Sequence, residues 1–133
     1  MQYAKAVALA IAASACGSPA TAPAVDAPPP VVFTDGMAMP PGFEIEGMWT
    51  GGPGDSFDVA LQLDGSALDW DIHTHDSGGT QTLVYQLGVS AGAYILVPDH
   101  QTTWYLLLRN HDAVTRTLQL RVETTGGTEF AWM

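Results

Sequence analysis

Basic residues are scarce in this 133-residue sequence, because Lys and Arg together number 4 against 14 Asp and Glu. The formal net charge at pH 7 is therefore -10. Proteins that bind nucleic acids use Lys and Arg to neutralise phosphates, so this composition excludes nucleic acid as a partner. It also excludes electrostatic attachment to anionic lipid headgroups, so any membrane attachment must be covalent or hydrophobic.

Cysteine occurs once, at Cys16, so no disulfide can form within the chain. Beyond the N-terminus, no apolar run is long enough to predict a membrane-spanning helix. Motifs of nucleophilic catalysis are missing as well, because no G-x-S-x-G elbow occurs and no Ser, His and Asp stand out as a set. We therefore expect a protein without enzymatic activity.

The first sixteen residues have the pattern of an export signal. Lys5 supplies a positive charge, residues 6–13 are apolar, and small residues precede Cys16. This order is typical of a cleaved secretory signal peptide, here residues 1–15, and the apolar stretch is too short to span a bilayer. An ordinary buried helix is the alternative, but neither a polar face nor a cap accompanies the run.

The segment Ala13-Ser14-Ala15-Cys16 resembles the lipobox of bacterial lipoproteins. The resemblance implies cleavage just before Cys16, whose thiol then carries a diacylglyceryl group, and two or more acyl chains give stable anchoring. It departs from the family at Ala13, where Leu is usual. Gly17 favours the outer membrane, because inner-membrane lipoproteins often have Asp there. Conventional cleavage near Ala15, which leaves a free thiol, is the alternative.

Seven of the nine prolines lie between Ser18 and Gly42. Such a segment buries too little apolar area to offset its ordering entropy, so residues 16–42 are predicted to be a lipidated cysteine and a flexible, disordered linker. A partly extended linker of this length reaches at most about 70 Å. Its predicted role is spacing, and the folded domain is predicted over residues 43–133.

Residues 43–133 combine β-branched and aromatic side chains with turn signals at short intervals. Four segments alternate apolar and polar side chains with period two, which predicts half-buried strands. These segments are 57–63, 68–72, 83–89 and 118–122. Shorter strands are predicted over 94–97 and before Trp132. Residues 104–108 are apolar throughout, which predicts a central strand covered on both faces. Seven or eight strands without a helix predict one small antiparallel β-sandwich of the immunoglobulin-like or jelly-roll kind.

Two of these segments carry a family resemblance. Residues 70–75 and 104–110, with a turn and a last alternating strand after them, resemble the GOLD class of β-sandwiches and the small exported bacterial domains similar to it. The resemblance covers about residues 56–123. It implies a binding or interaction role in a non-cytosolic compartment, and it carries over no catalytic residue.

The sharpest local feature is a row of alternating polar residues, Asp69, Asp71, His73 and His75. If the intervening side chains face the core, these four share the outer face at spacings of roughly 6.5–7 Å. Two imidazoles so placed could converge on one Zn or Cu ion. The alternative is an exposed polar strand face without a metal.

A functional metal site needs a third ligand, for which His100 and then Asp71 are the first candidates and His111 a further one. Cupins use a His-x-His pair in this way, but their downstream Glu and second His motif are missing here. Three methionines, whose thioethers suit Cu(I), give a second hint: Met37, Met39 and Met48. Ordinary filling of gaps in the core is the alternative for them.

The sequence thus predicts an exported lipoprotein of the bacterial cell envelope, held at the membrane by its lipid. Its β-sandwich is predicted to be a binding or envelope-interaction module for an unidentified protein or ligand, without a cofactor. The alternative is a periplasmic Zn- or Cu-binding protein that uses His73 and His75. Trp49 and Trp132, if exposed, would suit stacking on sugars, and core packing is the alternative for them.

Overall fold

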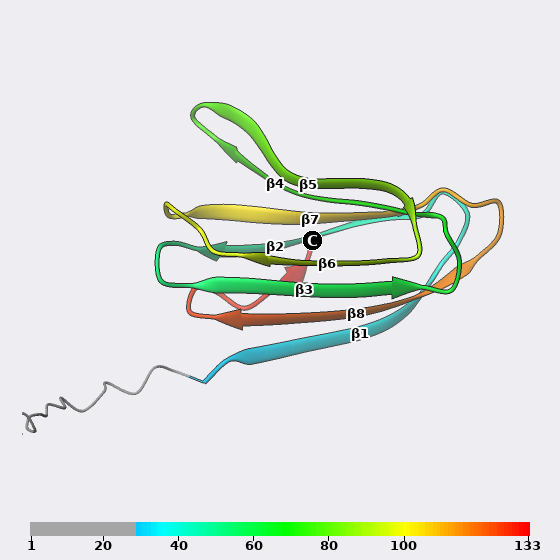
Figure 1. Cartoon of the computed structure of the whole chain (residues 1–133), viewed down its shortest axis with the longest axis horizontal. Coiled ribbons are helices and arrows are strands. Elements are labelled where there is room, and N and C mark those ends of the chain that lie inside the picture. Colours follow the sequence, from blue (N-terminus) through cyan, green and yellow to red (C-terminus); the bar gives the residue numbers. More distant parts are fainter. Residues whose placement is uncertain (1–28) are drawn as a thin grey trace, which may run out of the picture.

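The computed structural model describes residues 29–133, which form nine strands and no helix (Figure 1). The predicted signal peptide and Cys16 lie outside the described residues. Within the described part of the chain, no helix could cross a membrane. The strands are β1 (Val31–Met39), β2 (Glu44–Gly51), β3 (Ser56–Leu63), β4 (Leu68–Asp76), β5 (Gly79–Val89), β6 (Ala91–Leu96), β7 (Thr102–Asn110), β8 (Arg116–Thr125) and β9 (Ala131–Trp132).

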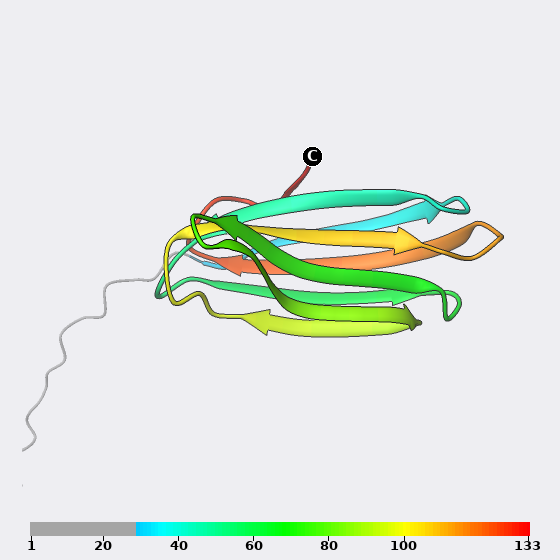
Figure 2. The same ribbon diagram turned by 90° about the horizontal axis from the view of Figure 1, so that it is seen from above.

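These strands form two antiparallel sheets packed face to face (Figure 1, Figure 2). One has the order β1-β8-β3-β6 and the other β5-β4-β7-β2-β9. The pairing is nested, because β1 pairs with β8, β2 with β7, β3 with β6 and β4 with β5. A long hairpin rolled up in this way is a jelly roll, to which the short β9 is added. The predicted all-β sandwich is confirmed, in its jelly-roll form.

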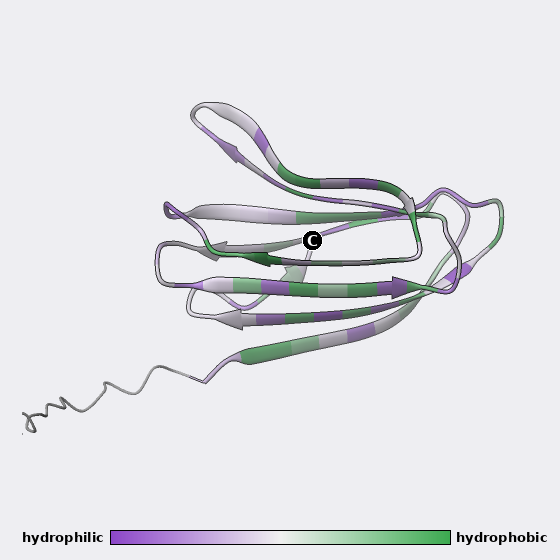
Figure 3. Ribbon diagram, viewed as in Figure 1, coloured by the Kyte–Doolittle hydropathy of each residue, from purple (hydrophilic) through white to green (hydrophobic). Residues whose placement is uncertain are grey.

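The core lies between the sheets and follows the period-two patterns of β3, β4 and β8. The row predicted over 83–89 is wrong as a buried face, because Tyr85 and Leu87 are exposed on β5. Hydrophobic and hydrophilic positions alternate along β3 and β8 (Figure 3), and the hydrophobic ones face inward. The largest fully buried side chains are Trp49, Trp70, Trp104, Phe57, Met39, Leu68, Ile72, Leu106, Leu108, Leu118, Val59 and Val122. Burying side chains of this size contributes roughly 1.5–3 kcal/mol each before chain entropy is subtracted.

The folded domain begins earlier than the predicted boundary at Phe43. β1 occupies residues that were assigned to the linker, yet it pairs along its whole length with β8, and Met39 is fully buried. Phe33 and Met37 also pack against the core. The prolines lie on either side of this strand and none lies within it, because proline cannot donate to a β-ladder and is found at strand ends.

The strand β7 is central in its sheet, as predicted, but one face of it is open. Trp104, Leu106 and Leu108 are buried between the sheets, whereas Tyr105 and Leu107 are half-buried on the outer face. No other layer of the described residues covers that face. Residues 104–108 are therefore apolar throughout because one face lies in the core and the other is a partly apolar surface. The expected cover on both faces is wrong.

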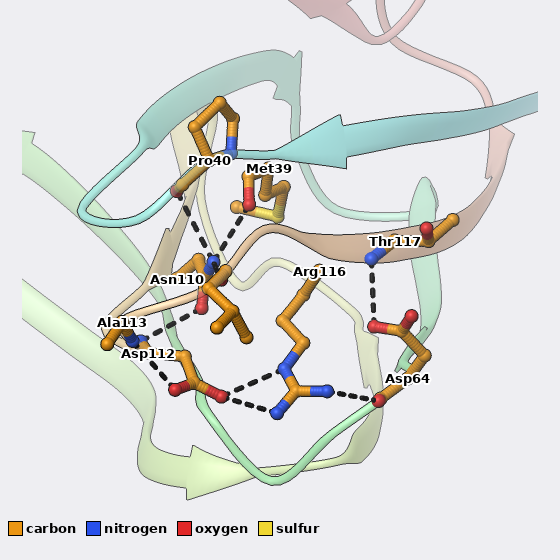
Figure 4. Close-up of polar contacts among 9 residues, drawn as sticks. Met39, Pro40, Asp64, Asn110, Asp112, Ala113, Arg116 and Thr117 are labelled. Carbon is orange, nitrogen blue, oxygen red and sulfur yellow. Dashed lines mark hydrogen bonds and ion pairs between the residues drawn. The ribbon is translucent and has the colours of Figure 1, made fainter.

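The turn from β7 to β8 is organised by Asn110, whose side chain is fully buried (Figure 4). Its Nδ2 donates to the carbonyl oxygens of Met39 at 2.8 Å and Val114 at 3.0 Å. Its Oδ1 accepts from the N–H of Asp112 at 3.0 Å. One amide thus ties the end of β1 to a turn far along the chain.

Arg116 closes the other side of this turn (Figure 4). Its guanidinium donates to Asp112 at 2.8 and 2.6 Å and to the carbonyl oxygen of Asp64 at 3.1 Å. Hydrogen bonds from Arg116 hold the pKa of Asp112 below its usual value. The carboxylate of Asp64 accepts from the N–H of Thr117 at 2.8 Å, so the turns at this end are joined by polar contacts.

Candidate functional site

The outer face of the five-stranded sheet carries most of the residues that the sequence singled out. Side chains of β4, β7 and β2 lie in rows across it, because the three strands are neighbours. One row joins Asp71, Leu107 and Glu46, and the next joins His73, Tyr105 and Met48. We call the surface formed by Glu46, Asp71, His73, His75 and Tyr105 the His–Tyr face.

His73 is 8% exposed and lies between two carboxylates. Its Nδ1 is 2.5 Å from Oδ1 of Asp71, and its Nε2 is 3.5 Å from Oε2 of Glu46. Its ring stacks on Tyr105 with centroids 5.4 Å apart. The contact with Asp71 therefore holds the His73 ring in one orientation.

His75 lies next to His73, as the period-two spacing predicted. The two imidazole centroids are 4.9 Å apart, and that of His75 is 5.4 Å from the ring of Tyr105. Nδ1 of His75 is 3.0 Å from the hydroxyl of Thr80 on β5. Two imidazoles and one phenol thus form a three-ring cluster whose outermost member, His75, is exposed.

The other two histidines lie in different ion pairs. His100 has its Nε2 3.1 Å from Asp76 and its Nδ1 2.5 Å from Asp99. His111 has its Nδ1 2.7 Å from Asp69. In residues 29–133 no group of three or more His, Cys, Asp or Glu could hold a metal ion. The structure thus joins the histidine pair of β4 but supplies no third ligand, and the metal site stays a prediction.

Hydrogen bonds with Asp99 and Asp76 raise the pKa of His100 above its ordinary value of 6.5. A group whose pKa is raised by folding stabilises the fold below its unfolded pKa, and that contribution is lost as the pH rises through the folded pKa. We therefore expect the melting temperature of His100→Gln to fall less than that of the unsubstituted chain as the pH rises above about 6.5.

Thermal unfolding followed by circular dichroism between about pH 5 and 9 measures this effect. The matched control is His111→Gln, which also removes a histidine paired with an aspartate. A His100→Gln profile parallel to that of the unsubstituted chain would contradict the prediction.

A shallow cavity of about 120 Å³ adjoins the His–Tyr face. Tyr85 and Leu87 form one wall of it, and 66% and 58% of these residues are exposed. The other lining residues come from three strands and include three carboxylates: Glu44, Asp69, Trp70, Asp71, Leu107 and Arg109. The cavity is therefore acidic, with an exposed aromatic side chain at its rim.

Sequence reasoning missed Tyr105 and Glu46. Tyr105 could have been found from its position in the strand. Successive side chains point to opposite faces, so a strand that buries Trp104 directs Tyr105 outward. Trp49, considered for sugar stacking, is fully buried, so core packing is confirmed for it. Trp132 is half-buried, and its indole N–H donates to Asp35 at 2.9 Å.

No family model matches the chain, and no curated protein matches it. Among solved structures, the crystal structure of the Yersinia pseudotuberculosis-derived mitogen is similar, with a TM-score of 0.49 and 11% sequence identity. The similarity covers 75% of this chain and 89% of that one. It bears on neither function nor site, and the GOLD resemblance stays a prediction.

Proposed function

We propose that this protein is a lipid-anchored envelope lipoprotein whose jelly-roll domain binds a cationic segment of another protein on the His–Tyr face. The observation that carries the proposal is the three-ring cluster of His73, His75 and Tyr105, bordered by the carboxylates of Glu46 and Asp71. Aromatic rings beside carboxylates are what Lys and Arg side chains bind.

Negative charge dominates this side of the domain. Arg109 is the only Lys or Arg in the five-stranded sheet. The other two arginines of the described residues are already paired, Arg116 with Asp112 and Arg121 with Glu123. The face therefore has a negative potential that attracts cations and steers their approach.

The shape of the face favours a macromolecular partner. Its cavity of about 120 Å³ is small beside the roughly 300–1,000 Å³ of typical small-molecule sites. The rings of Tyr85 and Tyr105 offer surfaces on which a cation gains about 0.5–1 kcal/mol at an exposed site. Several such contacts along one basic segment add up to specific binding, and we propose binding without catalysis.

Binding of an eight-residue arginine peptide tests the face. The full chain is used with Cys16→Ser, which keeps it free of lipid. We expect calorimetry at low salt to show saturable binding that Tyr105→Ala and Glu46→Gln each weaken about twofold to fivefold, and that 300 mM salt weakens further.

The matched control is Glu129→Gln, which removes the same charge from an exposed residue outside the face. If Glu46→Gln and Glu129→Gln weaken binding equally, the attraction is due to net charge alone and the face is not the site.

The anchor is proposed at Cys16 on the strength of its lipobox-like context. About 14 residues separate it from Val31, where β1 begins, so the proposed linker spans at most about 45 Å. This is shorter than the sequence suggested, because β1 belongs to the domain. The jelly roll would therefore work close to the membrane surface.

Intact-protein mass spectrometry should show a mature chain that begins at Cys16 and carries the added mass of a lipid. We expect Cys16→Ser to move the protein from the membrane fraction to the soluble fraction, since no other covalent anchor is predicted. Ser18→Ala, two residues further on, is the control and should fractionate as the unsubstituted chain does. A Cys16→Ser chain that stays with the membranes would place the anchor elsewhere.

A further inference from the structure

The edge strand β6 has backbone groups that pair with no other strand of residues 29–133. It ends the four-stranded sheet, and within these residues only its edge toward β3 is paired. The N–H of Leu63 donates to the carbonyl oxygen of Ser90 at 2.7 Å. This contact shows which residues of β6 hydrogen-bond to β3 and which point to the free edge. In an antiparallel pair, residues alternate between bonding to the partner and pointing away from it.

It follows that three residues of β6 direct their N–H and C=O groups to the free edge: Ala91, Ala93 and Ile95. The intervening residues bond to β3 instead: Gly92, Tyr94 and Leu96.

This free edge lacks the usual protection against strand pairing. Native edge strands carry charges, prolines or bulges. β6 has none of these between Ala91 and Leu96, and it pairs with β3 in continuous register. The neighbouring edge strand β5 differs, because its pairing with β4 is irregular at two places. Ile95, on the outer face of β6, is 63% exposed.

A groove of about 330 Å³ lies beside this edge. The groove is lined from β5 and from β6 with the loop after it. Both ribbon views show that the tip of the β4–β5 hairpin diverges from β6 (Figure 1, Figure 2). Most of the groove's lining residues have apolar or aromatic side chains, although polar atoms make up the larger part of its exposed wall: Gln81, Leu83, Tyr94, Ile95, Leu96, Val97, Pro98, Asp99 and Trp104. Trp104 is 2% exposed, and its indole Nε1 has no hydrogen-bond partner among the described residues.

We propose that β6 and this groove form a strand-addition site for an extended segment of another protein that alternates apolar and basic residues. A strand added to β6 directs every second side chain toward the groove, where the half-buried Leu83 and Tyr94 offer apolar contacts. Backbone hydrogen bonds supply affinity in this mode of recognition, and pockets for alternate side chains supply specificity.

The charges around the site select basic residues for the other face of the added strand. Asp58 lies opposite Ile95 on β3, within reach of a long side chain that crosses the edge. The side chain of Asp99, at the end of the groove, is 90% exposed.

Charge and proline content show which segments can pair with the free edge of β6. A second copy of this chain would bring another net charge of -10 to the edge and be repelled. The chain's own stretch between Pro19 and Pro30 has five prolines, which lack the N–H that a ladder needs. A basic, strand-forming segment of another protein is attracted by the negative charge and has the N–H groups that the ladder needs.

The probe is a nine-residue peptide that alternates valine with lysine, titrated into the full chain with Cys16→Ser. We expect saturable binding that Ala93→Pro weakens at least about tenfold, because proline removes a donor at the free edge and leaves the ladder to β3 intact. Val97→Ser, in the groove wall, should also weaken binding. N-methylation of alternate backbone nitrogens of the peptide should abolish it, whereas Tyr105→Ala should leave it unchanged.

Amide hydrogen exchange gives a second readout, in which peptide should slow exchange at Ala93 and Ile95 and leave Tyr94 unchanged. Binding that survives both Ala93→Pro and N-methylation would overturn the proposal, as would no binding by the unsubstituted edge. A dimer of the chain that Ala93→Pro abolishes would also overturn it, by assigning the edge to a second copy. Arginine-peptide binding on the His–Tyr face is independent of Ala93, so the two proposals can fail separately.

Discussion

Leu120→Asp is expected to unfold the domain completely. Leu120 is 3% exposed at the middle of β8, where that strand pairs with β1 on one side and β3 on the other. Its side chain points between the sheets, so the substitution places an unpaired carboxylate in the core. That costs several kcal/mol, and the lost apolar packing costs 2–5 more, against a typical total stability of about 5–15 kcal/mol.

Far-ultraviolet circular dichroism and one-dimensional NMR of the variant should therefore show an unfolded chain at 25 °C. The matched control is Gln119→Asp, which introduces the same charge one residue earlier, where the side chain faces outward and is exposed. It should stay folded and lose at most a few degrees in melting temperature. A Leu120→Asp chain with a native spectrum and melting transition would contradict the assignment of the core.

Asn110→Ala is expected to lower the free energy of unfolding by about 2–4 kcal/mol. The substitution removes three donated hydrogen bonds and one accepted bond, and it leaves the carbonyl oxygens of Met39, Pro40 and Val114 without their side-chain donor. Each net hydrogen bond contributes about 1 kcal/mol, and each buried group left unsatisfied costs about 1–3 kcal/mol. Urea titration should show a lower midpoint with an unchanged slope.

The companion variant Asn110→Asp removes the Nδ2 donor but keeps the shape of the side chain. It keeps the oxygen that accepts from Asp112 but turns a carboxylate toward the carbonyl oxygen of Met39. We expect it to be at least as destabilising as Asn110→Ala at pH 7, and to recover as the pH falls, because a protonated carboxyl can donate again. Equal urea midpoints for Asn110→Ala and the unsubstituted chain would show that this amide does not hold the turn.

Strand positions were predictable wherever one face is apolar and the other polar. In β3 and β8 the alternation is unbroken, so both strands and their buried faces follow from period two alone. β1 was missed because Asp35 lies on the same face as Phe33 and Met37 and interrupts the apolar row. Its partner, the indole N–H of Trp132, is remote in the sequence, so no local pattern indicates that the aspartate is satisfied.

The candidate site was predictable only in part, for a related reason. The approach of His73 to His75 follows from their spacing on one strand. The contacts of His73 with Tyr105 and Glu46 depend on the strand order β4-β7-β2, which period-two patterns do not determine. The position of His100 depends on the loop after β6, where side-chain direction follows no fixed period.

The nested pairing of the jelly roll also constrains when the chain can fold. Val31 of β1 pairs with Thr124 of β8, so β1 can pair only after the whole segment through β8 has left the ribosome. A pairing that closes so long a loop costs chain entropy before the stabilising contacts form. Such pairings therefore make folding slow. A polypeptide that is still unfolded can be threaded through a translocation channel. For a chain that we propose to be exported, this topology delays the folding that would otherwise block its passage.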